Sequence, residues 1–187
     1  AKGNSFQLHV PPGVNDLKWK PKPESWYFLE NGSITLGIQP DIDREKYKKT
    51  SFEIDDFMKN LANQISEKKI NILSARQKAQ IFVHQKNPWQ FTNKYTVAKN
   101  DLIDLSLGGI HHSWEDDPIN APYGNIVFEV QLEASDDEAT IRAFDQGKIN
   151  DNGMVRTLNI ADYFQHLDHD PIHNSYSMSS TEKQWFI

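Results

Sequence analysis

The sequence predicts a mainly β protein, an antiparallel barrel or jelly roll with a helical insertion. Short aromatic and β-branched runs, bounded by Gly, Asn and Asp turns, recur through most of the chain. Between about residues 43 and 69 a helical period replaces them. Many short strands with one helical interruption are typical of an antiparallel barrel or jelly roll. No repeat or low-complexity linker divides the 187 residues, so we expect a single domain over residues 1–187.

The first predicted strand covers residues 5–10, where polar and apolar side chains alternate, and Pro11 ends it. Side chains two positions apart on a strand share a face. Gln7 and His9 are therefore expected on one face of this strand. The apolar side chains of the strand belong to the other face: Phe6, Leu8 and Val10.

A tight hairpin is predicted over residues 25–38. Two aromatic and β-branched runs, residues 25–29 and 34–38, flank the segment Glu30-Asn31-Gly32-Ser33. Asn-Gly tolerates the positive φ angles of a type I′ turn, so the chain is expected to reverse at this dipeptide.

The helical insertion is predicted from apolar side chains at helical spacing, with Asp43 or Ser51 as alternative N-caps. The part from residue 51 to residue 66 is expected to pack outside the barrel. The segment 70–95 is ambiguous, and residues 80–84 read as a possible strand. Further strands are expected at 95–98, 102–107, 125–132 and 139–144, with a short helix near 160–167 and a last strand at 184–187.

The composition excludes several classes of protein. A net charge of −6 argues against a nucleic-acid partner, which usually meets a basic face. The chain has no cysteine, so a disulfide scaffold, a thiolate zinc site and cysteine catalysis are excluded. No apolar run reaches the ~20 residues that span a bilayer, so no membrane partner is expected. We therefore expect a cytoplasmic protein.

Four residues form a candidate metal site: Gln7, His9, Glu24 and one of the pair His111 and His112. Taken singly, each residue is typical of an ordinary surface or core position. Together they offer nitrogen and oxygen ligands of the kind that zinc prefers. With one negative ligand, a bound Zn²⁺ would keep a net positive charge and act as a Lewis acid. A second His- and Asp-rich stretch, residues 166–173, fits no zinc motif and is interpreted as a polar loop.

The order of motifs resembles that of the cupins and, within them, of the type I mannose-6-phosphate isomerases. The similarity runs over roughly residues 5–165 in consistent order. Its five pieces are Ser5-Phe6-Gln7-Leu8-His9-Val10-Pro11; Lys22-Pro23-Glu24-Ser25-Trp26-Tyr27; the spacing of Asn100, Ser106, Gly108 and His111; Glu129-Val130-Gln131 with Ser135-Asp136 and Thr140-Ile141-Arg142-Ala143-Phe144-Asp145; and Val155-Arg156-Thr157-Leu158-Asn159-Ile160. The third piece matches the second cupin motif in spacing, and this spacing selects His111 over His112 as the last metal ligand.

The resemblance implies a zinc-dependent interconversion of mannose 6-phosphate and fructose 6-phosphate through a cis-enediol. It implies a catalytic role for Arg142, which would stabilise the enediolate, for Glu129 as acid or base, and for Lys22 beside the metal ligand. A sugar phosphate is the implied partner, with Arg156 and Lys148 as substrate-binding residues. A guanidinium suits the bidentate geometry of a phosphate.

The chain also departs from the family pattern. The family's Asp-Trp-Gly-Arg stands here as Asp145-Gln146-Gly147-Lys148, and residues 113–124 read as an extra acidic loop. The family usually has further sequence on both sides, so the chain is interpreted either as a fragment of a longer isomerase or as a short relative. The competing function is a non-catalytic cupin module that binds a metal or a sugar. An iron dioxygenase is disfavoured because this ligand set differs from the usual facial triad.

Overall fold

The computed structural model describes residues 5–106, 109–113, 124–170 and 174. Its strands are β1 (Ser5–Leu8), β2 (Glu24–Phe28), β3 (Gly32–Ile38), β4 (Thr92–Val97), β5 (Leu102–Asp104), β6 (His111–Ser113), β7 (Val127–Gln131) and β8 (Ile141–Asp145). Its helices are α1 (Arg44–Ser66), α2 (Ile72–Lys86), α3 (Asp136–Ala139) and α4 (Ile160–His166), with a 3₁₀ turn η1 (Pro88–Phe91). The expected segments 113–124 and 184–187 lie mostly or wholly outside the described residues.

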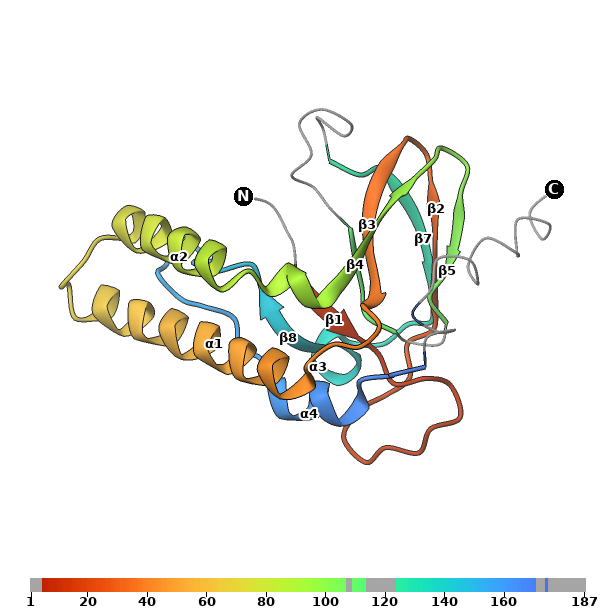
Figure 1. Ribbon diagram of the computed structural model, residues 1–187, viewed down its shortest axis with the longest axis horizontal. Coiled ribbons are helices and arrows are strands. Elements are labelled where there is room, and N and C mark those ends of the chain that lie inside the picture. The colour runs from red at the N-terminus through yellow and green to blue at the C-terminus, as the bar shows by residue number, and fades with distance from the viewer. Residues whose placement is uncertain (1–4, 107–108, 114–123, 171–173, 175–187) are drawn as a thin grey trace.

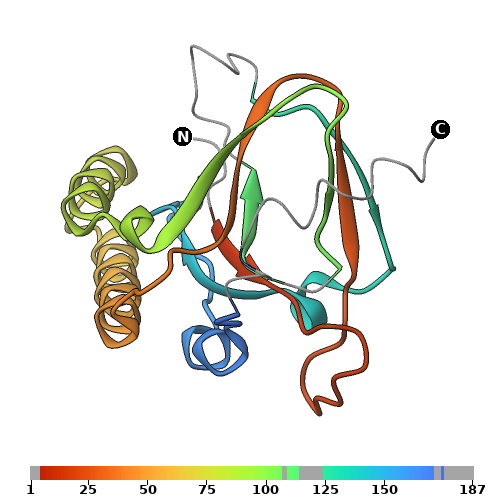
Figure 2. The same cartoon turned by 45° about the vertical axis from the view of Figure 1, so that its right-hand side comes forward.

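The strands form two antiparallel sheets that face each other (Figures 1 and 2). One sheet has five strands in the order β4-β3-β6-β1-β8, and the other has three in the order β5-β2-β7. Every pairing between these strands is antiparallel, as the sequence predicted. The two sheets share no strand within the described part of the chain, so they form an open sandwich rather than a closed barrel.

The molecule has three layers: the three-stranded sheet, the five-stranded sheet and the helices. An apolar cluster fills each of the two spaces between them. Trp26 and Phe28 of the three-stranded sheet pack between the sheets against Ile34 and Leu36 of β3. A larger cluster fills the space between the five-stranded sheet and the helices; it includes Phe6, Leu8, Val10, Tyr47, Ile54, Leu61, Ala79, Phe144 and Tyr163. The polar and apolar side chains of this segment lie on opposite faces, as predicted. The apolar ones pack against the helices, and Gln7 and His9 lie between the sheets.

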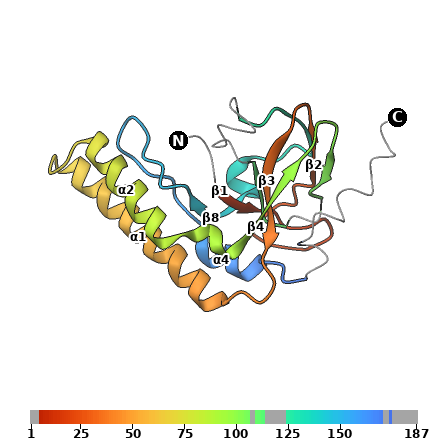
Figure 3. The same cartoon turned by 45° about the horizontal axis from the view of Figure 1, so that its top comes forward.

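The helical insertion is longer than predicted, because it consists of the hairpin of α1 and α2 (Figure 3). Asp43 is the N-cap of α1, and its side chain accepts a hydrogen bond from the N–H of Lys46. The strand considered for residues 80–84 is wrong. Asn71 caps α2, and Ala75, Ala79 and Val83 recur every fourth residue on its buried face.

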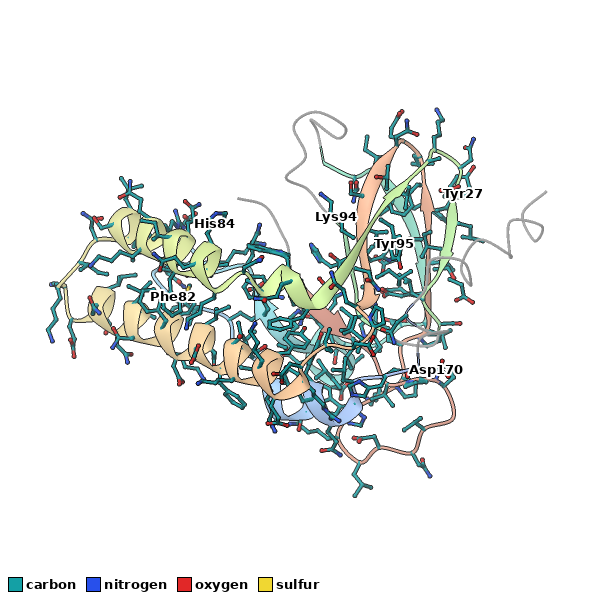
Figure 4. All side chains as sticks on the ribbon, in the orientation of Figure 1. Tyr27, Phe82, His84, Lys94, Tyr95 and Asp170 are labelled. Carbon is teal, nitrogen blue, oxygen red and sulfur yellow. The ribbon has the colours of Figure 1, made fainter. Side chains whose placement is uncertain are left out.

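A stacked pair of rings joins the two helices of the insertion. Phe57 of α1 and Phe82 of α2 have ring centroids 3.9 Å apart and an interplanar angle of 12°. Phe82 lies between the two helices in Figure 4. The β-branched and aromatic run around Phe82 resembles a strand locally, but packing against α1 decides in favour of the helix.

The predicted hairpin over residues 25–38 is also wrong. β2 and β3 follow each other but belong to different sheets, so the chain crosses from one sheet to the other at this point. Neither Asn31 nor Gly32 has the positive φ that a type I′ turn needs. Glycine is needed at position 32 because the Asn125 side chain lies close to the backbone there. A Cβ at this position would lie 2.1 Å from Asn125 Oδ1. The Asn125 amide accepts from the N–H of Ser33 at 3.0 Å and donates to its carbonyl at 2.6 Å.

The later strands and the short helix near 160–167 are found close to their predicted places. The one-turn helix α3 was not predicted. No helix in the described part of the chain is long and apolar enough to cross a membrane.

Candidate metal centre

A buried cluster of His9, Glu24 and His111 lies between the two sheets. His9 follows β1, Glu24 is the first residue of β2, and His111 is the first residue of β6. The contact between Glu24 and the two histidines therefore joins the three-stranded sheet to the five-stranded sheet. Glu24 Oε1 lies 2.7 Å from His111 Nε2, and Glu24 Oε2 lies 3.5 Å from His9 Nε2. The side chains of all three residues are at most 1% exposed.

Each histidine ring is oriented by a backbone carbonyl. Nδ1–H of His9 donates to the carbonyl of Ala139 at 2.7 Å, and Nδ1–H of His111 donates to the carbonyl of Gly109 at 2.7 Å. In a neutral ring this bond leaves the lone pair on Nε2, which faces Glu24. Histidines that bind metals are commonly fixed in this way by a hydrogen bond from their second nitrogen.

The donor atoms that face one another fit a divalent cation. The three side chains each offer a ligand atom, and these atoms lie within 4.8 Å of one another. His9 Nε2 and both oxygens of Glu24 are buried, and Lys22 Nζ approaches Glu24 Oε2 to 2.9 Å. Lone pairs so close together need a proton or a metal ion between them. Ligand atoms of a tetrahedral zinc site lie roughly 3.3 Å apart, so small shifts would admit the ion.

The pKa shifts of Glu24 and His9 both suit a metal site. Burial disfavours the carboxylate form of Glu24, but hydrogen bonds and charge from His111 and His9 outweigh this effect and lower the pKa of Glu24. Burial is the main cause that lowers the pKa of His9. Both directions favour the forms that bind metals: an ionised carboxylate and a neutral imidazole.

Gln7 lies beside the cluster but faces it with its amide nitrogen. Its Nε2 is 3.3 Å from His111 Nε2, while its Oε1 accepts a hydrogen bond from Arg142 Nη2 at 3.3 Å. Rotating the amide by 180° would turn Oε1 toward the cluster and end the bond from Arg142. Gln7 as a fourth ligand thus remains a prediction. His112, which pairs with Thr35 in the five-stranded sheet, is not a member of the cluster.

Three further residues predicted from the sequence surround the cluster. Lys22 Nζ lies 2.9 Å from Glu24 Oε2 and 3.7 Å from Glu129 Oε1. Burial and the charge of Glu24 raise the pKa of Glu129, whereas Lys22 opposes this rise. Arg142 sits opposite Gln7 in the pairing of β1 with β8.

Asp136 is a residue of this site to which the sequence analysis gave no role. It accepts a hydrogen bond from Arg142 Nη2 at 2.8 Å. Burial opposes ionisation of Asp136, but Arg142 and, less strongly, Thr140 and Arg156 lower its pKa. The run of acidic residues at 136–138, just before the strand that carries Arg142, was the sequence signal that could have indicated this partner.

Lys148 and Arg156 lie in a different place from the cluster. Both line a pocket beside α2, and Arg156 Nε is 3.3 Å from Asp145 Oδ2. The charge of Arg156 is one of the causes that lower the pKa of Asp136. In the His- and Asp-rich stretch, His166 Nε2 pairs with Asp16 Oδ2 at 3.2 Å, and its described residues form no metal-binding group. His173 lies outside the described residues.

One solved structure gives a comparison for this fold. The chain is similar to the mannose 6-phosphate isomerase from Bacillus subtilis, with a TM-score of 0.54 and 16% sequence identity. The match covers 93% of this chain and 43% of that enzyme, so the chain spans less than half of its length. No protein-family model and no curated protein sequence matches the chain. At this identity the likeness shows the fold, which agrees with the antiparallel β architecture predicted from the sequence.

Proposed function

We propose that the chain is a metal-dependent aldose–ketose isomerase of the mannose-6-phosphate isomerase type, built on a cupin jelly roll. The observation that carries this proposal is the buried group of His9, Glu24 and His111, whose ligand atoms lie within 4.8 Å of one another. The similarity in fold to a mannose 6-phosphate isomerase supports the same proposal. The reaction proposed is the interconversion of mannose 6-phosphate and fructose 6-phosphate through a cis-enediol.

His9, Glu24 and His111 would hold one divalent ion, and zinc suits this set of nitrogen and oxygen donors. Gln7 is proposed as the fourth ligand after rotation of its amide. When bound, the ion supplies positive charge that favours the ionised oxygens of the sugar. The hydrogen bonds from the two histidine rings to backbone carbonyls orient Nε2 of each ring for the ion.

Glu129 is the proposed acid and base. As a carboxylate it takes the proton from C2 of the aldose. The C2–H electron pair then forms the C1–C2 double bond, and the electrons of the C1 carbonyl move to O1. Transfer of a proton from O2 to O1, with return of the carbon-bound proton from Glu129 to C1, yields the ketose with its carbonyl at C2. The pKa of Glu129 is raised by burial and by Glu24, which makes the carboxylate a stronger base than an exposed one. Lys22, 3.7 Å from Glu129, opposes this rise.

Arg142 is proposed to stabilise the negative charge of the enediolate. Its Nη2 donates to Asp136 Oδ1 at 2.8 Å, a contact that rotation of the Gln7 amide does not break, so the guanidinium is held before substrate binds. Its Nε is buried and has no hydrogen-bond partner in the described residues, so one donor remains for a substrate oxygen. A fixed donor in a dry site stabilises developing charge more than one that must reorient.

A second candidate function, a non-catalytic module that binds a metal or a sugar, is favoured by one observation. The ligand side chains are at most 1% exposed, whereas a catalytic zinc site keeps a coordination position open. A buried, closed cluster would suit a metal that only supports the fold.

A coupled assay for fructose 6-phosphate separates these two functions. We expect the zinc-loaded chain to convert mannose 6-phosphate and to lose this activity when a chelator removes the metal. The matched control is unphosphorylated mannose, which should react much more slowly. A folded chain that binds zinc but converts no hexose phosphate would contradict the isomerase proposal and support the binding module.

A further inference from the structure

The outer face of β7 carries a row of exposed apolar side chains. Along the strand and the residue on each side of it, Ile126, Phe128, Val130 and Leu132 are 45%, 60%, 50% and 63% exposed. Side chains two positions apart on a strand share a face, so these four form one continuous row, which we call the β7 row. It exposes roughly 400 Å² of apolar surface, as much as the largest patch on a typical monomer.

β7 is also an open edge of its sheet. Within the described part of the chain it pairs with β2 alone, at the end of the order β5-β2-β7 (Figure 2). The N–H of Leu132 donates to the carbonyl of Pro23 at 3.2 Å. The carbonyl of Ile126 accepts from the N–H of Leu29 at 2.9 Å. The even-numbered residues therefore bond to β2, and the backbone N–H and C=O groups of residues 127, 129 and 131 point to the open edge.

The open edge lacks the features that commonly keep an edge strand from pairing. Lysine, proline or a β-bulge usually blunts such an edge. Residues 126–132 contain no lysine and no proline, and Glu129 is their only charged residue. The register of β7 with β2 runs without a shift from Gln131 to Val127. A straight, apolar edge of this kind favours the addition of another strand.

We propose that β7 pairs with β7 of a second copy of this chain, antiparallel, about a twofold axis at Val130. A twofold axis brings the same surface of both copies together. In this register Phe128 lies opposite Leu132 of the second copy, and Glu129 lies opposite Gln131 of the second copy. The strand is thus complementary to itself, which favours a second copy over a different protein as the partner.

The side chains of the strand select this register among the neighbouring ones. With the axis at Glu129, two carboxylates would lie directly opposite each other, which is destabilising. With the axis at Phe128, Leu132 would lie opposite a glycine and lose its apolar partner. With the axis at Val130, the apolar side chains from 128 to 132 face one another, and the amide of Gln131 lies beside the carboxylate of Glu129 on both sides of the axis.

Sedimentation velocity of the full chain over a concentration series tests the association. We expect a reversible dimer with a Kd of about 10–100 μM, because one pair of edge strands is a small interface. Phe128→Lys and Leu132→Glu should each weaken the dimer at least about tenfold, since each puts an unpaired charge into the apolar row. The double variant should recover it, because opposite charges then face each other twice. Both positions are at least 60% exposed, so the monomer should fold, which circular dichroism verifies.

A single introduced cysteine tests the register, because the chain has no cysteine of its own. Val130→Cys would place two thiols opposite each other in a non-hydrogen-bonded pair, with Cα atoms about 4.5 Å apart, which is within disulfide range. Ile126→Cys is the matched control, because it has the same face and a similar exposure but would lie about 25 Å from its own copy. Mild oxidation should cross-link Val130→Cys and leave Ile126→Cys almost entirely monomeric on a non-reducing gel.

Two results would overturn the inference. One is a wild-type chain that stays monomeric up to about 1 mM, well above the Kd expected of a small interface. The other is a dimer that Phe128→Lys and Leu132→Glu leave intact, or one in which Ile126→Cys cross-links as fast as Val130→Cys. The β7 row faces away from the space between the sheets that holds His9, Glu24 and His111, so zinc binding and isomerisation are read separately.

Discussion

Two backbone carbonyls decide which nitrogen of each histidine faces Glu24. The carbonyls of Ala139 and Gly109 each accept an Nδ1–H, and this leaves the lone pair of Nε2 facing Glu24. Neither carbonyl is encoded by a recognisable side chain, so the sequence could suggest the ligands but not the tautomers. The separation of His111 from His112 followed from motif spacing, and the cluster contains His111.

The first prediction concerns His111 and its neighbour. His111→Ala removes one donor and leaves Glu24 buried opposite a gap, so zinc affinity should fall at least about 100-fold. His112→Ala leaves the cluster untouched and should bind zinc nearly as tightly as the wild type. Zinc titration against a competing chelator measures both, with circular dichroism to verify folding. Equal losses in the two variants would contradict the assignment.

Arg142 is the residue on which the proposed turnover depends most. Arg142→Ala should lower kcat by about 10²–10³, because a fixed donor to the enediolate is lost. Zinc content should not change, since Arg142 is not a ligand. Arg142→Lys keeps the charge without the fork and should recover part of the rate. Wild-type kcat in Arg142→Ala would exclude Arg142 from the reaction.

Gly32 is part of a strong turn signal in the sequence, but in the structure it is needed for another reason. Asn31-Gly32 is typical of a hairpin, but the glycine is needed because Asn125 approaches its backbone. That approach depends on a segment 93 positions away, at residue 125, which no local pattern could reveal. In contrast, the alternation of residues 5–10 predicted correctly which side chains share a face, because burial of one face is a local constraint.

A double-mutant cycle tests the role of Gly32. Gly32→Ala should destabilise the protein by about 1–3 kcal/mol, because its Cβ overlaps Asn125 Oδ1. In an Asn125→Ala background the same change should cost much less, because the overlapping atoms are gone. Denaturant unfolding of the four proteins gives the coupling energy. If Gly32→Ala costs the same in both backgrounds, steric contact with Asn125 is not the reason for the glycine.

The helical insertion is tested at residues 81 and 82. Phe82 stacks on Phe57, so Phe82→Ala should cost about 2 kcal/mol or more of unfolding free energy. Ile81 is 60% exposed, and Ile81→Ala should change stability by less than about 0.5 kcal/mol. Urea unfolding measures both. A larger cost for Ile81→Ala than for Phe82→Ala would contradict the helical packing.

The two sheets come together around the buried cluster of His9, Glu24 and His111. Glu24 begins a strand of the three-stranded sheet, whereas His9 and His111 belong to the five-stranded side, so a bound ion would join the sheets at a point where three polar side chains are buried. The sequence could indicate antiparallel strands and a ligand set. It could not show that the sheets remain open or that the insertion has two helices, because both depend on packing between distant segments.

Anomalous X-ray scattering at the zinc absorption edge tests the central claim most directly, in crystals of the chain grown with zinc. We predict one dominant peak, within about 2.0–2.2 Å of His9 Nε2, His111 Nε2 and a Glu24 oxygen. A difference map from Glu24→Gln crystals should show that peak greatly reduced. No peak at this cluster, or a dominant peak at the stretch 166–173 instead, would contradict the account.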